Sequence, residues 1–147
     1  MIIDLTKKQY DALLQLVYIG NHVANYNRSE RIDEFDALEQ AVFSRFREFG
    51  CSSLVRMEGD LDHCFPTEKL TVMAGAFIDV YNDANFWDII TNSLARRDLV
   101  EMFGEKAVAD MDYPVLVENE LPIFHHYSEE FDKNGIKNLV LRKPAGV

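Results

Sequence analysis

The sequence predicts a mostly α-helical single domain over residues 1–147, folded as a bundle or irregular array of five to six helices with a minor extended C-terminal element. Two patterns predict this fold class. Apolar residues recur at three- and four-residue intervals over long segments, and capping residues and glycines stand at the ends of those segments. The chain has 147 residues, of which 48% are hydrophobic and 12% aromatic, which is typical of one domain with its own core.

Two helices are predicted in the N-terminal third of the chain. Thr6 and Gln9 form a capping-box pattern, and the apolar spacing that follows predicts a helix over about residues 7–24. A second helical pattern covers residues 32–49. Gly50 then stands where a left-handed C-terminal cap belongs, so we expect the second helix to end there.

Two further helical patterns follow, over residues 66–81 and 85–103, with polar residues between them. Gly104 ends the second of these patterns, and a short helical turn is expected over residues 105–110. Small side chains at residues 74–76 remove bulk from the first pattern. Because glycine costs a helix about 1 kcal/mol relative to alanine, we expect another helix to cross closely at this point.

The C-terminal part is expected to contain one more helix and an extended tail. Pro122 suits the first position of the helix, and Gly135 suits its end. The tail over residues 136–141 is rich in β-forming residues, but a lone strand is not stable. We therefore expect it to join a minor sheet with residues 2–5 or 53–56, or to pair with a second subunit.

The charge of the chain excludes several classes of partner. Twenty-five acidic residues against fifteen basic residues give a net charge of −10, and the basic residues form no large cluster. We therefore expect no direct binding of nucleic acid. The N-terminus lacks the pattern of a secretion signal, and no segment approaches the roughly 20 apolar residues of a membrane span. The expected location is cytoplasmic, without membrane association.

Acidic residues supply the candidate metal ligands. A loop over residues 58–64 combines three carboxylates with an imidazole and a thiol, but it lacks the glycine and the closing glutamate of a calcium loop. Two aspartates four residues apart on a predicted helix would suit Mg²⁺ bound with a nucleotide. A solvated polar surface is the favoured interpretation of both groups, and no cofactor is predicted. The candidate ligands for a divalent metal are Glu58, Asp60, Asp62, His63, Asp79 and Asp83.

The segment around the single tryptophan is the most distinctive string in the chain. Trp87, Ile90 and Leu94 share one helical stripe, which indicates burial against a neighbouring element. Arg96 and Arg97 lie near Asp98, Glu101 and other acidic residues, and ordinary ion pairs are the favoured interpretation.

The sequence contains no catalytic motif that we recognise, since the serine-elbow, Walker and dinucleotide-binding patterns are all missing. The leading hypothesis is a non-enzymatic, protein-binding or regulatory module that binds a protein partner or forms a homodimer. It rests on the aromatic content, the unpaired tail and the lack of a catalytic group. One alternative is a metal-dependent hydrolase acting on a nucleotide or other phosphorylated small molecule. Another is an acidic inhibitor that mimics nucleic acid.

Overall fold

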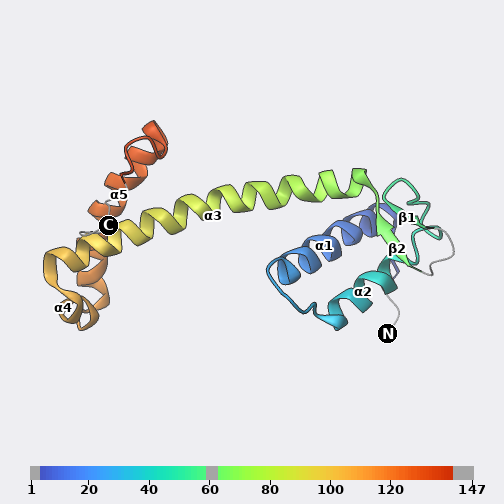
Figure 1. Cartoon of the computed structure of the whole chain (residues 1–147), viewed down its shortest axis with the longest axis horizontal. Coiled ribbons are helices and arrows are strands. Elements are labelled where there is room, and N and C mark those ends of the chain that lie inside the picture. Colours follow the sequence, from blue (N-terminus) through green and yellow to red (C-terminus); the bar gives the residue numbers. More distant parts are fainter. Residues whose placement is uncertain (1–3, 59–62, 141–147) are drawn as a thin grey trace. The chain divides into compact units, whose positions relative to one another are not determined.

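The computed structural model describes residues 4–58 and 63–140 of the chain (Figure 1). Within these residues it contains five helices and one two-stranded sheet, which confirms the mostly helical fold class. Among the same residues, no helix is both long enough and apolar enough to cross a membrane. The elements in chain order are α1 (Lys7–Asn25), α2 (Asp33–Phe43), β1 (Val55–Met57), β2 (Cys64–Pro66), α3 (Glu68–Phe103), α4 (Glu105–Ala109) and α5 (Tyr113–Asn134).

The chain divides into two compact units, an N-terminal unit of Met1–Tyr81 and a C-terminal unit of Asn82–Val147. The N-terminal unit contains α1, α2, the sheet and the first part of α3. The C-terminal unit contains the rest of α3 together with α4 and α5. Each unit has buried apolar residues of its own. The single domain that the sequence predicts over residues 1–147 stays a prediction.

α1 begins and ends close to the predicted positions because the predicted capping box forms. The Thr6 hydroxyl accepts a hydrogen bond from the Gln9 backbone N–H at 3.3 Å, and the Gln9 side-chain oxygen accepts one from the Thr6 N–H at 2.9 Å. These bonds satisfy backbone donors that the first turn of a helix leaves without partners. The fixed start places Tyr10 and Leu14 on the buried face of α1.

α2 is shorter than predicted, because it ends at Phe43 and residues 44–50 form successive turns. In these turns the Phe46 N–H donates to the Phe43 carbonyl at 3.0 Å, so the chain is wound more tightly than an α-helix. The tighter winding is compatible with burying both aromatic side chains, which are 4% and 0% exposed. Gly50 does adopt the expected positive φ, of 65°.

The core of the N-terminal unit joins residues from all its elements. The Tyr10 hydroxyl donates to the Val42 carbonyl at 2.6 Å, and the Tyr10 ring stacks on Phe49 with centroids 4.1 Å apart. Burial raises the pKa of Tyr10 to about 12. The buried members of this core are Tyr10, Leu14, Phe43, Phe46, Cys51, Leu54, Val55, Cys64 and Leu70.

The Cys51 thiol is part of this core and has a polar partner. It donates a hydrogen bond to the Asp11 carboxylate at 2.9 Å, and its residue is 1% exposed. Burial, and then the neighbouring Asp11, raises the pKa of the Cys51 thiol to about 11. At neutral pH the thiol is therefore protonated.

The sheet differs from the one that the sequence predicts. β1 pairs with β2 in antiparallel register, with Arg56 opposite Phe65, so the segment near residues 53–56 finds its partner nine residues further along the chain. Closing such a short loop costs less conformational entropy than pairing with the distant tail. The minor sheet predicted for residues 136–141 does not form within residues 136–140, because turns occupy residues 135–138 and residues 139–140 have no regular structure. Pairing of the tail with a second subunit stays a prediction. Residues 1–3 and 141 lie outside the described residues.

α3 is one continuous helix, so the predicted break before residue 85 is wrong. Residues 82–85 are Asn, Asp, Ala and Asn, with no glycine or proline, and asparagine and aspartate lower helix propensity without stopping a helix. The helix ends where predicted, next to Gly104, which has a φ of 85°. The expected close crossing at residues 74–76 is not present at Gly75, because a Cβ there would meet nothing within 4 Å.

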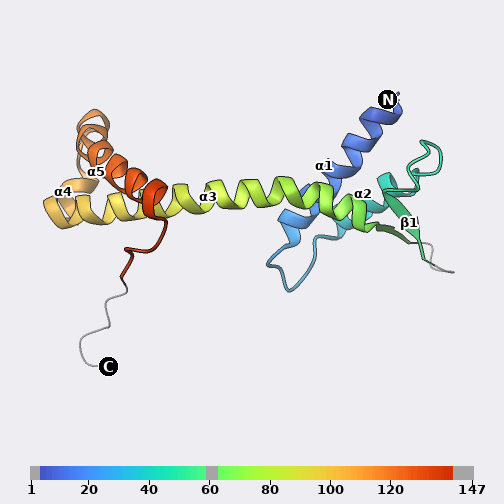
Figure 2. The same ribbon diagram turned by 90° about the horizontal axis from the view of Figure 1, so that it is seen from above.

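In the C-terminal unit, α5 crosses α3 (Figures 1 and 2). The short helix α4 forms where the sequence predicts a helical turn. The prediction that Pro122 begins the last helix is wrong, because α5 begins at Tyr113 and contains Pro122 in its interior. An interior proline costs a helix about 3 kcal/mol. Further along α5, Phe131 is buried and packs on Trp87 of α3, with ring centroids 5.5 Å apart. Gly135, with a φ of 57°, ends α5 as predicted.

One buried and one exposed apolar side chain give a matched test of the core. Leu14→Ala removes a side chain that is 0% exposed, and we expect it to lower the free energy of unfolding by about 2–5 kcal/mol. Val72→Ala changes a side chain of α3 that is 64% exposed, and its effect is expected within about 0.5 kcal/mol. Urea denaturation followed by circular dichroism measures both. Equal losses in the two variants would show that the core is not where the structure places it.

Candidate functional site

Two grooves adjoin on the N-terminal unit and share Gly20 of α1. One groove, of about 490 Å³, lies between α1 and the N-terminal part of α3, and the other, of about 260 Å³, lies between α1 and α2. Together we call them the apolar surface. Its lining residues are Leu16, Val17, Ile19, Gly20, Asn21, Val23, Ala24, Phe35, Leu38, Phe77, Ile78 and Tyr81.

The apolar surface combines exposed apolar side chains with a lack of charge. None of its lining residues is charged, although 27% of the chain is charged. Six of its large apolar side chains are exposed to solvent, and exposed apolar side chains grouped on one surface are typical of interaction sites. These six are Leu16, Val23, Phe35, Leu38, Phe77 and Tyr81, with exposed fractions between 43% and 67%.

Gly20 lines both grooves, and because it has no side chain the apolar surface is recessed there. A Cβ built on Gly20 would meet nothing within 4 Å, so no neighbouring side chain in the described residues requires glycine at this position. Its φ is not positive, so the backbone does not require it either. A larger side chain would stabilise α1 by as much as about 1 kcal/mol. The backbone of α1 is therefore open to close approach from outside at this point.

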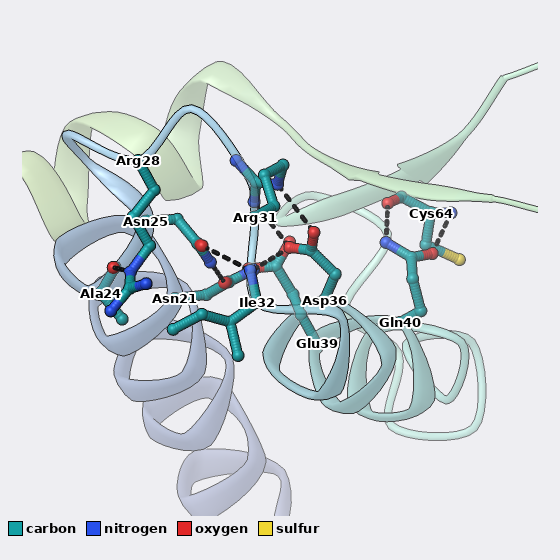
Figure 3. A network of polar contacts seen from close by, with 10 residues as sticks. All are labelled: Asn21, Ala24, Asn25, Arg28, Arg31, Ile32, Asp36, Glu39, Gln40 and Cys64. Carbon is teal, nitrogen blue, oxygen red and sulfur yellow. Dashed lines mark hydrogen bonds and ion pairs between the residues drawn. The ribbon is translucent and has the colours of Figure 1, made fainter.

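A network of asparagine and carboxylate side chains fixes α1 against α2 beside the apolar surface (Figure 3). The Asn21 amide donates to Asp36 and to Glu39, each at 2.9 Å. Its own oxygen accepts a bond from the Asn25 amide at 2.6 Å. The Asn25 oxygen in turn accepts the backbone N–H of Ile32, at 2.8 Å, where α2 starts. We call these contacts the asparagine network.

The two carboxylates of the asparagine network have pKa values displaced in opposite directions. Arg31 donates two hydrogen bonds to Asp36, at 2.7 and 2.6 Å, and together with the Asn21 bond they lower the pKa of Asp36 to about 2. Burial raises the pKa of Glu39. Opposite shifts of this kind are used in acid–base catalysis, but here hydrogen bonds within the network already engage both carboxylates. The arrangement therefore explains how α1 and α2 pack against each other.

The structure does not gather the candidate metal ligands into one site. Glu58 forms an ion pair with Arg56 at 2.7 Å, and the His63 ring lies against Phe65 with centroids 4.8 Å apart. Asp79 and Asp83 lie exposed on α3, while Asp60 and Asp62 lie outside the described residues. In residues 4–58 and 63–140, no group of three or more His, Cys, Asp or Glu side chains could hold a metal ion. A metal site stays a prediction.

The sequence contained a signal for the asparagine network that we did not use. Asn21 and Asn25 follow Tyr10 and Leu14 on the buried face of α1, and they are only 5% and 6% exposed. Two amides four residues apart on an otherwise apolar stripe must find hydrogen-bond partners when buried. That pattern predicts a polar contact with the next helix.

No protein-family model, curated protein or solved structure matches the chain.

Through Asp36, the asparagine network makes the free energy of unfolding decrease as the pH falls. The pKa of Asp36 is about 2 in the folded chain and has an ordinary value of 3.8, so its contribution is complete above about pH 4 and is lost as the pH falls toward 2. We expect Asp36→Asn to be less stable than the unmodified chain at pH 7, but to lose less stability between pH 4 and pH 2. Urea denaturation at a series of pH values measures this difference.

Glu39→Gln is the control, because we expect it to keep or raise the free energy of unfolding at pH 7, whereas Asp36→Asn should lower it. The glutamine oxygen still accepts the hydrogen bond from Asn21, and the buried charge is removed. Because the pKa of Glu39 is raised, its ionised form is disfavoured in the folded chain, and the variant should be at least as stable as the unmodified chain at pH 7. If the curves of the chain and of Asp36→Asn stayed parallel from pH 4 to pH 2, Asp36 would not carry the dependence.

Proposed function

We propose that the chain is a non-enzymatic cytoplasmic protein that acts by binding protein, and that its apolar surface pairs with the same surface of a second copy to form a homodimer. One observation carries the proposal, namely an uncharged surface on which six large apolar side chains are each 43–67% exposed. Exposed apolar side chains that lie together on one surface are typical of protein interfaces.

The lack of charge on the apolar surface favours a second copy over a basic partner. A basic partner would be recognised by acidic side chains, and the apolar surface has none among its lining residues in the described part of the chain. In a two-fold dimer the same residues face each other, so any charge in the surface would meet its own sign. The apolar surface thus adds no like-charge contact to the repulsion between two chains that each carry −10.

The shape of the surface also suits dimerisation. Phe77 and Tyr81 supply exposed aromatic side chains, which are frequent anchors of protein interfaces. Gly20 lets another backbone or side chain approach α1 closely. The asparagine network holds α1 and α2 in place before association, which reduces the entropy lost on binding.

The two alternative functions have less support from the described residues. A metal-dependent hydrolase needs ligands brought together, and Asp79 and Asp83 have no third ligand beside them there. An acidic mimic of nucleic acid needs carboxylates spaced along one face like phosphates, and no observation places them so. Both alternatives stay predictions, and we propose neither.

Phe77→Asp tests the homodimer directly. The substitution places a charge in the apolar surface, and in a two-fold interface it places two like charges near each other. We expect the unmodified chain to have twice its 17.0 kDa mass by size-exclusion chromatography with light scattering, and the variant to elute as a monomer. Val72→Asp is the matched control, because Val72 is also 64% exposed on α3 but does not line the surface.

Gly20→Leu tests the same proposal without adding a charge. A leucine side chain fits the open space at Gly20 in a monomer, so folding should be preserved or improved. In a dimer it would occupy the space that the second copy needs, and we expect at least a tenfold weaker association. A 17.0 kDa mass for the unmodified chain at high micromolar concentration would refute the homodimer. So would an unchanged dimer in both the Phe77 and the Gly20 variants.

A further inference from the structure

A separate hollow of about 400 Å³ lies between α3 and α5 in the C-terminal unit. Three aromatic side chains contribute to its wall, Trp87 from α3 and Phe124 and Phe131 from α5. The Trp87 and Phe131 rings are 5.5 Å apart and inclined at 42°, so they form adjoining parts of the wall. A volume of 400 Å³ falls within the range of small-molecule sites in proteins.

The polar side chains of this hollow lack partners. Asp88 of α3 and Asp132 of α5 line it, and neither carboxylate forms a hydrogen bond or an ion pair with another described residue. By contrast, Asp98 in the same unit pairs with Arg97, as the sequence predicts, and also accepts a hydrogen bond from Tyr127. Two carboxylates without cations beside them form a negative rim around aromatic walls.

The side chain of Thr91 provides a second observation, independent of the two carboxylates. Its residue is only 4% exposed, it lines the hollow, and its hydroxyl has no hydrogen-bond partner among the described residues. Among the described residues, no fully buried side-chain nitrogen or oxygen lacks a partner, so the Thr91 hydroxyl oxygen is open to the hollow that the residue lines. The Thr91 hydroxyl is therefore available to a ligand in the hollow.

We propose that this hollow binds a primary ammonium ion with an apolar body. The apolar body would pack on the aromatic walls, whose ring faces also attract a positive charge. The ammonium group has three N–H donors, which the carboxylates of Asp88 and Asp132 and the hydroxyl of Thr91 can accept. No Lys, Arg or His is among the lining residues that the structure describes, and the net charge of −10 favours the approach of cations.

Other classes of ligand fit the hollow less well. An anion would meet two carboxylates and no cation. A bare divalent metal ion takes about six or more oxygen ligands, and the described residues contain no group of three candidate ligands. A neutral apolar molecule would gain no hydrogen bond from the carboxylates or from the Thr91 hydroxyl, so the polar side chains favour an organic cation.

The position of the single tryptophan provides the measurement. Because Trp87 lines the hollow, its fluorescence should change when the full chain is titrated with 2-phenylethylammonium, and the change should saturate. The neutral compound 2-phenylethanol has nearly the same shape, and we expect it to bind at least tenfold more weakly. Equal affinity for the two compounds, or no saturable change with the amine, would overturn the proposal.

Three variants test the assigned side chains. Asp88→Asn and Asp132→Asn should each weaken binding of 2-phenylethylammonium about tenfold, and Thr91→Val should weaken it severalfold while keeping the shape of the side chain. Glu118→Gln is the control, since it removes one negative charge from α5 outside the hollow and should leave affinity unchanged. Circular dichroism verifies that each variant folds. Unchanged affinity in both aspartate variants would overturn the assignment.

An ammonium group can come from a free amine or from a lysine side chain of a partner protein. Titration with a lysine blocked at its α-amino and carboxyl groups separates the two sources. Tighter binding of 2-phenylethylammonium would identify a free amine, and tighter binding of the blocked lysine would identify a partner's side chain. If neither bound more tightly than 2-phenylethanol, the hollow would not be an ammonium site. None of these results depends on the dimer, because the hollow and the apolar surface share no residue.

Discussion

The Asn21 side chain is the contact on which the N-terminal unit depends. A buried amide is costly unless its donors and acceptor are all used, and Asn21 meets this condition with two carboxylates of α2 and a second asparagine of α1. Only one relative position of α1 and α2 satisfies all of these bonds at once. Apolar packing between Leu14 and Phe43 tolerates small shifts, but the asparagine network does not. The groove between the two helices therefore has a defined shape.

Sequence patterns that mark the end of a single helix were reliable. The capping box of α1, the positive φ of Gly50 and the glycine ends of α3 and α5 were all predictable, because each depends on a few neighbouring residues. The errors arose where tertiary packing overrides local preference. Pro122 lies inside α5 although it removes a backbone hydrogen bond, and the asparagines and the aspartate within residues 82–85 did not end α3.

The candidate sites were less predictable than the fold. Chemistry-bearing residues that are adjacent in sequence, such as Glu58 and His63, attracted attention, yet each has a nearby partner in the sheet. The apolar surface combines residues from three separate helices, and its exposure follows from packing that no local pattern encodes. The stripe containing Trp87 indicated burial, and Trp87 is indeed partly buried, but the hollow beside it depends on α5. A stripe of apolar residues cannot show whether its neighbour fills the space completely.

The environment of Cys51 has a consequence for the chemical durability of the chain. Only the thiolate attacks electrophiles and disulfides, and a thiol whose pKa is about 11 is ionised in roughly one molecule in ten thousand at neutral pH. The side chain is also shielded from reagents by the core around it. Alkylating compounds and mild oxidants should therefore leave this sulfur intact in the native state, and its modification would report that the surrounding core had opened.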